Sequence, residues 1–266
     1  MPRLKHSIIA ELPSPETIDF KQLARDYAAG DIDLVVVLGP TASGKTRYAV
    51  RLAERLGGEI ISADSRQVYR GMDIGTGKDL AEYGAIPCHL IDIAEPGEQY
   101  NVWRFQQDFI RACTDIRSRG AVPILCGGTG LYINAVTRGY DFSGNVPLSA
   151  AREDAPREGF PRHPFFIGTL VDRDTRNARI DARLDARLQE GMVEEIRSLL
   201  ERGVSAGTLI SYGLEYKYVT LYLLGELSYA EMRERLATAI HQFAKRQMTW
   251  WRGMERSGVR IHWVEV

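Results

Sequence analysis

A short glycine-rich segment that follows an aliphatic run constrains this chain more than any other feature. Residues 34–38 read LVVVL and are followed at once by GPTASGKT at 39–46. The spacing G-x-x-x-x-G-K-T after a strand is typical of a phosphate-binding loop, whose backbone N–H groups surround an anion. The helix that follows such a loop directs its positive N-terminal end at the same anion. We therefore expect a buried strand, a phosphate-binding loop and a helix, in that order.

The residues of this loop divide into two side chains and a backbone frame. Lys45 supplies a positive charge, and the Thr46 hydroxyl can bind a magnesium ion held against the phosphates. The residues that shape the backbone frame are Gly39, Pro40, Thr41, Ala42, Ser43 and Gly44. A glycine-rich turn without a ligand would not explain why Lys and Thr stand together after the second glycine. The sequence thus predicts a phosphate site with Mg²⁺ as its cofactor.

The composition narrows the class of protein. A chain of 266 residues has room for one large α/β domain, with or without a small appendage. The formal net charge is −1, so any contact with nucleic acid must come from a local basic patch. Three separated cysteines without a C-x-x-C pair favour a reducing, cytoplasmic compartment over a disulfide frame or a zinc site. The N-terminal residues do not resemble a secretion signal, no apolar run reaches membrane-spanning length, and nothing requires more than a monomer.

The first half of the chain alternates between apolar runs and amphipathic segments. We expect strands at 34–38, 59–64, 87–93 and 122–126, and helices at 45–56 and 102–119. This order predicts an α/β fold, with a P-loop NTPase-like parallel sheet and helices on both faces. Ligands of such sheets bind beyond the carboxyl ends of the strands. The phosphate loop, Asp64 and Thr129 each follow a strand, so they should meet in one crevice.

The rest of the chain divides by composition. Residues 1–33 form a leader with one weak helical pattern, and residues 34–138 form the P-loop core. Residues 139–164 are rich in Pro and Gly, which predicts a loop or linker. Residues 165–266 hold the remainder of the core and a C-terminal helical part, beginning with a strand at 165–171.

Two helices are expected in that last part. The first runs from about Thr175 to Arg202, with arginines on one face at positions 176, 179, 183 and 187. These arginines either form ion pairs on a solvated face or reach back to the phosphate site. The second helix opens with the capping box Ser228-x-x-Glu231, and its apolar stripe comprises Met232, Leu236, Ile240, Phe243 and one of Trp250 and Trp251.

Two further motifs carry chemistry. Residues 64–69 read DSRQVY and 71–78 read GMDIGTGK, which place a carboxylate at a strand end beside hydroxyl and amide groups. Residues 127–133 read GGTGLYI and offer a hydroxyl at a neighbouring strand end. With QEGMVEEI at 189–196 and AKRQMTWWR at 244–252, these motifs closely resemble the tRNA dimethylallyltransferases, also called tRNA isopentenyltransferases. The resemblance runs from about Leu34 to Glu265, apart from the middle.

The resemblance implies a reaction and roles for particular residues. The loop would hold the diphosphate of dimethylallyl diphosphate, and the acceptor would be the exocyclic amine of an adenosine flipped out of the tRNA anticodon loop. Asp64 matches the family's general base, and Thr129 matches a residue that positions the reacting atoms. Lys45, with Arg183 or Arg179, would stabilise the leaving diphosphate. The residues expected to contact the tRNA or its adenine are Asp64, Ser65, Arg66, Gln67, Lys245, Arg246 and Arg252.

The chain departs from the family pattern in its middle. Family members usually carry a helical insertion of several dozen residues after the Gly-Gly-Thr segment, and 139–164 is too short for it. A shortened insertion suits either a compact tRNA enzyme or an isopentenyltransferase that acts on a free adenine nucleotide. A P-loop kinase or ATPase is a third alternative, with Asp92 as its magnesium-binding acid. A non-catalytic RNA-binding relative is disfavoured because Lys45, Thr46, Asp64 and Thr129 are all present.

Overall fold

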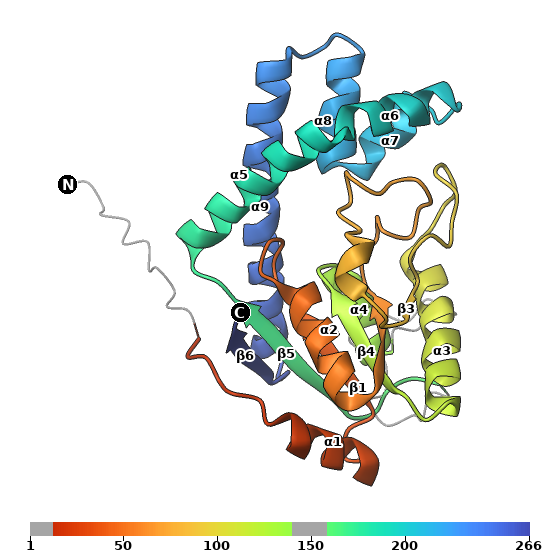
Figure 1. The fold of residues 1–266 in the computed structure, drawn as a ribbon, viewed down its shortest axis with the longest axis vertical. Coiled ribbons are helices and arrows are strands. Elements are labelled where there is room, and N and C mark those ends of the chain that lie inside the picture. Colours follow the sequence, from red (N-terminus) through yellow and green to blue (C-terminus); the bar gives the residue numbers. More distant parts are fainter. Residues whose placement is uncertain (1–12, 140–158) are drawn as a thin grey trace, which may run out of the picture.

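The computed structural model describes residues 13–139 and 159–266, which fold around a parallel β-sheet. The strand order is β3-β2-β4-β1-β5-β6, and each neighbouring pair is parallel (Figure 1). The strands are β1 (Leu34–Leu38), β2 (Gly58–Ser62), β3 (Cys88–His89), β4 (Val122–Gly127), β5 (Pro164–Leu170) and β6 (Ile261–Glu265). The predicted α/β fold with a parallel sheet is confirmed.

Helices cover both faces of this sheet. Along β1, Leu34 and Val36 pack into one hydrophobic core, while Val35 and Val37 pack into a second core on the opposite face. The second core is covered by α1 (Phe20–Ala29) and α2 (Lys45–Leu56). The first core includes α3 (Val102–Ser118) and α4 (Gly130–Thr137). Because successive strand side chains point to opposite faces, a strand that is apolar throughout requires cover on both sides.

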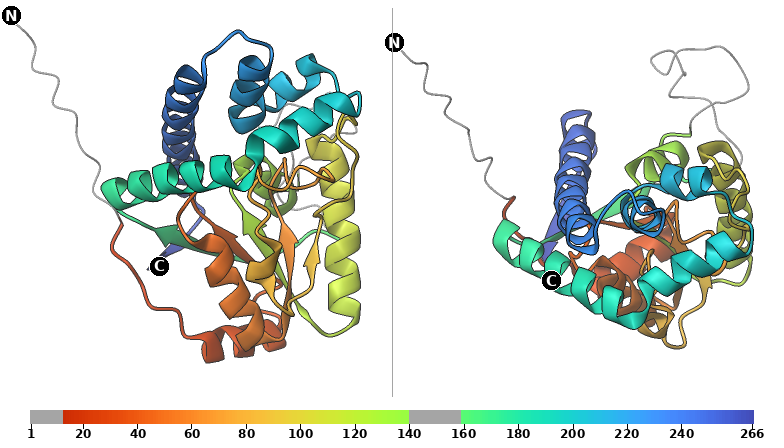
Figure 2. Two further views of the ribbon diagram at one scale, coloured as in Figure 1. Left: turned by 45° about the horizontal axis from the view of Figure 1, so that its top comes forward. Right: turned by 90° about the horizontal axis from the view of Figure 1, so that it is seen from above.

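A C-terminal helical part stands over the carboxyl ends of the strands. Figure 1 shows it above the sheet, and the left view of Figure 2 shows α5 lying across the molecule above α2. Its helices are α5 (Arg173–Glu190), α6 (Met192–Glu201), α7 (Ala206–Tyr212), α8 (Leu214–Leu223) and α9 (Tyr229–Arg256). This arrangement brings the arginine-bearing α5 over the phosphate loop.

The single helix predicted from Thr175 to Arg202 is wrong, because the structure has two helices there. Gly191 separates α5 from α6 in a left-handed conformation with φ of 106°. A glycine adopts such a conformation without steric cost and commonly ends a helix. The chain therefore turns before the residues of α6 and redirects Glu195 toward the loop that follows β2.

Several strand and helix bounds also differ from the predictions. The strand expected at 87–93 shortens to β3, and the one expected at 59–64 ends before Asp64. Strand β5 begins at Pro164, inside the segment assigned to the linker. Strand β6 and the helices α4, α7 and α8 were not predicted, because their short segments lack a sustained hydrophobic period.

The final helix begins as predicted. The Ser228 side chain accepts from the Glu231 N–H and the Glu231 carboxylate accepts from the Ser228 N–H, which completes a capping box. Met232, Leu236 and Ile240 are buried as expected, whereas Phe243 is only half-buried. Of the two tryptophans, Trp251 is buried and Trp250 is 41% exposed. The apolar stripe therefore continues through Trp251.

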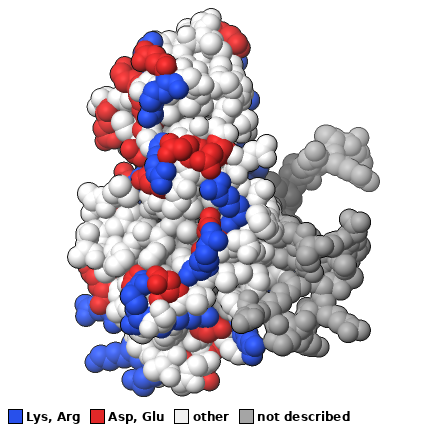
Figure 3. Space-filling model, turned by 90° about the vertical axis from the view of Figure 1, so that its right-hand side faces the viewer, with Lys and Arg blue, Asp and Glu red and all other residues white. Residues whose placement is uncertain are grey.

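Two further observations concern the surface. None of the helices formed by residues 13–139 and 159–266 is long and apolar enough to cross a membrane. On the side of the molecule that carries α3, positive and negative side chains are interspersed (Figure 3).

Most of the predicted linker, residues 140–158, lies outside the described residues, as do residues 1–12 of the leader.

Candidate active site

The glycine-rich loop between β1 and α2 is held in place by side chains from distant elements. The Ser43 hydroxyl is 2.6 Å from the Thr169 hydroxyl of β5, and both side chains are buried. The Thr41 N–H donates to Gln247 Oε1 of α9 at 2.8 Å. Gly44 adopts a φ of 78° directly before Lys45, the first residue of α2. The loop thus has a fixed shape at the positive end of α2.

A cavity of about 470 Å³ opens beside this loop and is lined by half of the predicted site residues. Thr129, which was expected in the same crevice, does not line it. Lys45 and Asp64 line the same cavity, so the two groups face a shared space as the sequence predicted. Both arginines that were alternatives, Arg179 and Arg183, line it as well. The other predicted site residues in its wall are Thr41, Ala42, Gly44, Thr46 and Gln67. Gly39, Pro40 and Ser43 shape the loop without lining the cavity.

Asp64 and Thr129 are coupled through the backbone between them. The Asp64 Oδ1 accepts from the Arg66 N–H at 2.9 Å, and the Thr129 Oγ1 accepts from the Ser65 N–H at 3.2 Å. The Thr129 N–H in turn donates to the Ala63 carbonyl at 3.2 Å. Thr129 precedes α4, but its side chain makes no capping hydrogen bond with that helix. The ends of β2 and β4 therefore form one rigid unit.

The electrostatics of Lys45 suit an anion-binding group. Burial lowers the pKa of its ammonium, and the nearby Arg183 lowers that pKa further, against opposing effects from Cys126 and Asp64. Lys45 forms no ion pair within the described part of the chain, and its Nζ donates only to the Pro40 carbonyl, at 3.4 Å. A cation that is desolvated and unpaired gains most when an anion enters its cavity.

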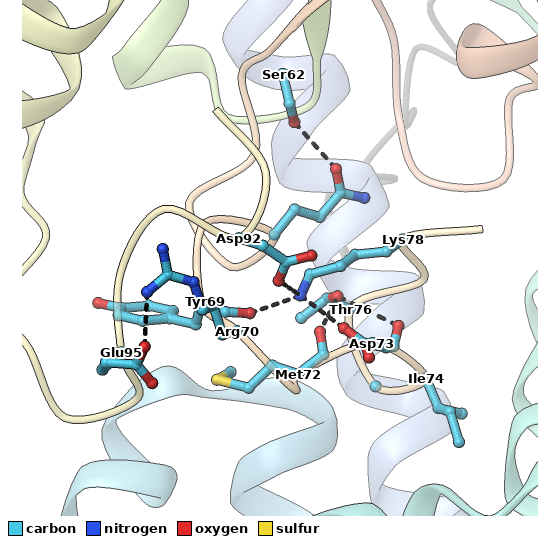
Figure 4. Close-up of polar contacts among 12 residues, drawn as sticks. Ser62, Tyr69, Arg70, Met72, Asp73, Ile74, Thr76, Lys78, Asp92 and Glu95 are labelled. Atoms are coloured by element: carbon cyan, nitrogen blue, oxygen red, sulfur yellow. Dashed lines mark hydrogen bonds and ion pairs between the residues drawn. The ribbon is translucent and has the colours of Figure 1, made fainter. Parts of the chain in front are cut away.

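The segment 73–78 forms the opposite wall and carries a second lysine. The Lys78 ammonium is 1% exposed and lies between the carboxylates of Asp73 and Asp92 (Figure 4). It also donates to the Tyr69 carbonyl at 2.6 Å. The distance from Lys78 Nζ to Asp73 Oδ1 is 2.7 Å. Asp92, which the kinase alternative would assign to magnesium, is instead a partner of this buried ammonium.

Glu195 of α6 fastens the same segment. Its carboxylate accepts from the backbone N–H groups of Asp73 at 2.8 Å, Ile74 at 2.7 Å and Gly75 at 3.1 Å. The Tyr216 hydroxyl donates to the same carboxylate at 2.9 Å. The sequence placed Glu195 in a motif but assigned it no role. The three backbone donors lie about 120 residues away along the chain, where no local pattern points to them.

Arg187 is a second residue whose role the sequence did not reveal. It is buried under Gly77, so a Cβ added to Gly77 would lie 1.5 Å from Arg187 Nη2 and 2.0 Å from Arg183 Nη2. Burial, together with the nearby Arg183, lowers the pKa of Arg187 to about 10, while Glu215 opposes the shift. Burial also raises the pKa of Glu215. Arg187 thus packs against the glycine segment, close to Arg183.

The predicted RNA-contacting residues on α9 lie outside the cavity. Lys245, Arg246 and Arg252 are not part of its wall, and neither are Ser65 and Arg66. The Arg66 Nε donates to the Tyr212 carbonyl at 2.8 Å, and its guanidinium lies 5.1 Å from the Tyr212 ring.

Gln247 connects α9 to the site. Its Nε2 donates to the Gly128 carbonyl at 3.0 Å, while its Oε1 holds Thr41. One amide therefore joins the phosphate loop, the Gly-Gly-Thr segment and α9.

The sheet, the loop after β1 and the helices on both faces define a P-loop NTPase-like α/β protein. Comparisons with known proteins narrow this class. The family model described as "IPP transferase" matches residues 67–159 and 143–254, and the model "Isopentenyl transferase" matches residues 32–83. The chain is 48% identical to tRNA dimethylallyltransferase 1 of Azobacteroides pseudotrichonymphae, over 89% of this chain and 94% of that protein. It is 49% identical to the enzyme of the same name from Porphyromonas gingivalis, over 87% and 93%.

A solved structure agrees. The full-length tRNA isopentenylpyrophosphate transferase of Bacillus halodurans superposes with a TM-score of 0.76 at 33% identity, covering 88% of this chain and 89% of that chain. The chain therefore belongs to the tRNA dimethylallyltransferase family, whose members are prenyltransferases. The kinase and free-nucleotide alternatives are not favoured.

The alignments also bear on the middle of the chain. The match to the Azobacteroides protein spans 287 positions although it covers only 89% of a 266-residue chain, so that relative has residues which this chain lacks. The two matches to the "IPP transferase" model overlap at residues 143–159, inside the segment predicted as a shortened insertion.

Proposed function

We propose that this protein transfers a dimethylallyl group from dimethylallyl diphosphate to the exocyclic amine of an adenosine in the anticodon loop of a tRNA. One observation carries the proposal: Lys45 and Asp64 line the same cavity, with Arg179 and Arg183 in its wall. An anion-binding end and a proton-accepting group thus face one space. The relatives named above are tRNA dimethylallyltransferases, which supports this donor and acceptor.

The chemistry assigns a part to each group. The carbon–oxygen bond of the donor breaks, a carbon–nitrogen bond to the adenine amine forms, and the amine loses a proton to Asp64. Lys45, the N-terminal end of α2, and Arg179 or Arg183 would hold the diphosphate as it gains negative charge. General-base assistance contributes about 10²–10⁴ in rate. Thr129, fixed to the backbone beside Asp64, would orient the amine.

The donor set fits a magnesium ion that is bound mainly through the ligand. Within the described residues, no three His, Cys, Asp or Glu side chains gather as a metal site. Mg²⁺ commonly uses one or two protein oxygens and takes the rest from phosphates and water. Thr46 lies in the cavity wall and would supply such an oxygen. The ion, when bound, would offset the charge of the departing diphosphate.

The acceptor would approach from the side of α9. Lys245, Arg246 and Arg252 are carried by this helix, and Gln247 ties the helix to the phosphate loop. With a shortened insertion, we expect binding of tRNA to be weaker than in longer relatives, and the reaction at the amine to be retained. We further propose that the protein acts as a cytoplasmic monomer.

Mass spectrometry of a reaction mixture tests the proposal. The protein is incubated with dimethylallyl diphosphate and Mg²⁺, together with unmodified tRNA, AMP or ATP. Prenylated tRNA is expected, with no prenylated AMP. Prenylated AMP without prenylated tRNA would establish the free-nucleotide alternative, and phosphate release from ATP with neither product would establish a kinase or ATPase.

A further inference from the structure

Arg187 is a buried cation of α5 to which the reaction described above assigns no part. It is 8% exposed, and it lies one helical turn beyond Arg183, which lines the diphosphate cavity. Arg187 itself is absent from the wall that the described residues form around this cavity. Burying a charge is costly unless a partner compensates it.

The partners of Arg187 compensate this cost only in part. Its Nη1 lies 3.9 Å from Glu215 Oε1 of α8, which is a long ion pair. Its Nη2 is buried and has no hydrogen-bond partner among the residues that the structure describes. The Glu215 side chain is 14% exposed, so this carboxylate is also held in the interior. The pair is therefore loosely made, although both groups are removed from water.

Two guanidinium groups meet over Gly77. The position that a Cβ of Gly77 would take is 1.5 Å from Arg187 Nη2 and 2.0 Å from Arg183 Nη2, so these two nitrogens are at most 3.5 Å apart. Gly77 is a firm base for them, because its carbonyl accepts from Gln67 Nε2 at 3.2 Å and its N–H donates to the Ile74 carbonyl at 3.2 Å. Arg183 is therefore in contact with a fixed segment and with a like charge.

This like charge makes Arg183 a stronger ligand for an anion. Two cations at such a distance repel each other, and the burial of Arg187 limits the screening by water. In the described structure, the one carboxylate within ion-pair distance of Arg183 is that of Asp79, at 3.5 Å, and its side chain is 53% exposed. An anion in the cavity relieves the repulsion, so Arg183 gains more from a diphosphate than an isolated arginine would.

We propose that Arg187 is a positioning residue of the diphosphate site, which holds Arg183 at the cavity wall and through its buried charge strengthens the binding of diphosphate by Arg183. Glu215 keeps Arg187 in place. The proposal rests on the proposed function, because it names a residue that acts on the same leaving group. Of the two arginines that the sequence left as alternatives, it assigns the diphosphate to Arg183.

Exchange of the buried pair for apolar side chains tests the proposal. Arg187→Met together with Glu215→Leu removes both charges, so no carboxylate is left buried without its cation, and the free energy of unfolding should stay equal or rise. Binding of inorganic diphosphate in the presence of Mg²⁺ is measured by calorimetry for this variant and for the wild type. The dissociation constant should rise about 3- to 30-fold. An unchanged constant in the folded variant would overturn the proposal.

A single change at Glu215 distinguishes a role of the charge from a purely structural role of the pair. Glu215→Gln keeps the size of the side chain and an acceptor for Arg187, but it leaves the positive charge of Arg187 uncompensated. Diphosphate should therefore bind to this variant at least as tightly as to the wild type. A pair that only supports the fold predicts weaker binding after either change, and that result would overturn the proposal.

The same exchange in two further backgrounds shows whether Arg187 acts through Arg183. In an Arg183→Met background, Arg187→Met/Glu215→Leu should leave the dissociation constant unchanged, since the arginine on which Arg187 acts is absent. In an Arg179→Met background, the exchange should weaken binding as much as it does in the wild type. Equal losses in both backgrounds would show that Arg187 acts independently of Arg183 and would overturn the proposal.

A matched control and a separate assay distinguish the possible failures. Arg176→Met removes another arginine of α5 that is absent from the described cavity wall, and it should leave the dissociation constant unchanged. Prenyl transfer to tRNA by the wild type is measured independently. If the wild type binds diphosphate but prenylates no tRNA, the proposed function fails, and the binding measurements still decide the role of Arg187. If transfer occurs and the exchange changes nothing, only the positioning role is rejected.

Discussion

Two glycine–lysine segments flank the diphosphate cavity, and their lysines have opposite surroundings. Lys45 closes the segment 39–45 and has no carboxylate partner in the described structure, while burial lowers its pKa. Lys78 closes the segment 75–78 and is enclosed by two carboxylates and a backbone carbonyl. The first is a positive charge available to a ligand, and the second is neutralised by the protein.

Similar sequence patterns therefore acquire different roles from partners that are distant along the chain. Lys45 begins a helix whose N-terminal end leaves donors free, so the protein provides a site for an anion there. The backbone donors of segment 73–75 are already satisfied by Glu195. The segment near Lys78 is therefore a rigid wall, and the loop near Lys45 is a binding surface.

Removal of the charge on Lys45 should reduce activity more than any other change in the two segments. Lys45→Met should lower the rate of prenyl transfer about 10²- to 10³-fold, because a positioned donor to the leaving group is lost. Its free energy of unfolding should stay equal or rise slightly, since a desolvated charge is removed. Steady-state kinetics and urea unfolding of the same preparation measure both. Wild-type turnover would exclude Lys45 from the reaction.

Lys78→Met, in contrast to Lys45→Met, should lower the free energy of unfolding. The change leaves the buried Tyr69 carbonyl without its donor and two carboxylates without their cation. We expect a loss of about 3 kcal/mol in the free energy of unfolding, measured by urea denaturation. A loss no greater than that of Lys45→Met would contradict the distinction between the two lysines.

Two glycines with the same backbone angle φ allow a matched comparison, with a smaller expected effect on the free energy of unfolding. Gly57 and Gly77 both have φ of 62°, but a Cβ on Gly57 meets nothing within 4 Å, while one on Gly77 meets two guanidinium groups. Gly57→Ala should cost about 1 kcal/mol for the left-handed backbone alone. Gly77→Ala should cost about 1–3 kcal/mol more, because buried Arg187 cannot withdraw. Thermal or urea unfolding of the two variants measures the difference, and equal losses would contradict it.

Displacement of Arg183 should add a functional difference between these two variants. Gly77→Ala should weaken diphosphate binding, whereas Gly57→Ala should not, as calorimetric titration would show. Unchanged affinity in both would mean that Arg183 does not depend on the segment beneath it.

The smallest effect concerns pH. Lys45 has an ordinary pKa of 10.5, which burial lowers, and a bound diphosphate would raise it again. The ligand therefore prefers the protonated form, so affinity is complete below the lowered pKa and falls as pH rises through it. Lys45→Arg should remove this part of the pH dependence and leave only the titration of the ligand. A wild-type profile identical to that of Lys45→Arg would contradict the lowered pKa.

Local sequence patterns were sufficient to predict the part of the site around β1. The apolar run, the glycine spacing and the helix after it occupy contiguous residues, so strand, loop and helix could be predicted with nearly correct bounds. Asp64 and Thr129 could be placed together because parallel strands end at one edge of a sheet. The sequence also showed that arginines recur on one face of α5.

The rest of the site depends on contacts that no local pattern encodes. Gln247 meets the phosphate loop across about 200 residues, and Glu195 meets segment 73–75 across about 120. The break at Gly191 was visible as a glycine but lies within an otherwise continuous helical pattern. Burial of Arg187 depends on the packing of α5 against Gly77, which the helical period alone does not specify.

The most direct test of the account separates proton transfer from diphosphate binding at Asp64. Asp64→Asn keeps the size of the side chain and the acceptor for the Arg66 N–H but cannot accept the proton of the amine. Single-turnover prenyl transfer to tRNA should fall about 10²- to 10⁴-fold, while the dissociation constant for diphosphate measured by calorimetry stays near that of the wild type. Transfer at the wild-type rate would contradict the assignment of Asp64 as the base in the cavity that holds the diphosphate.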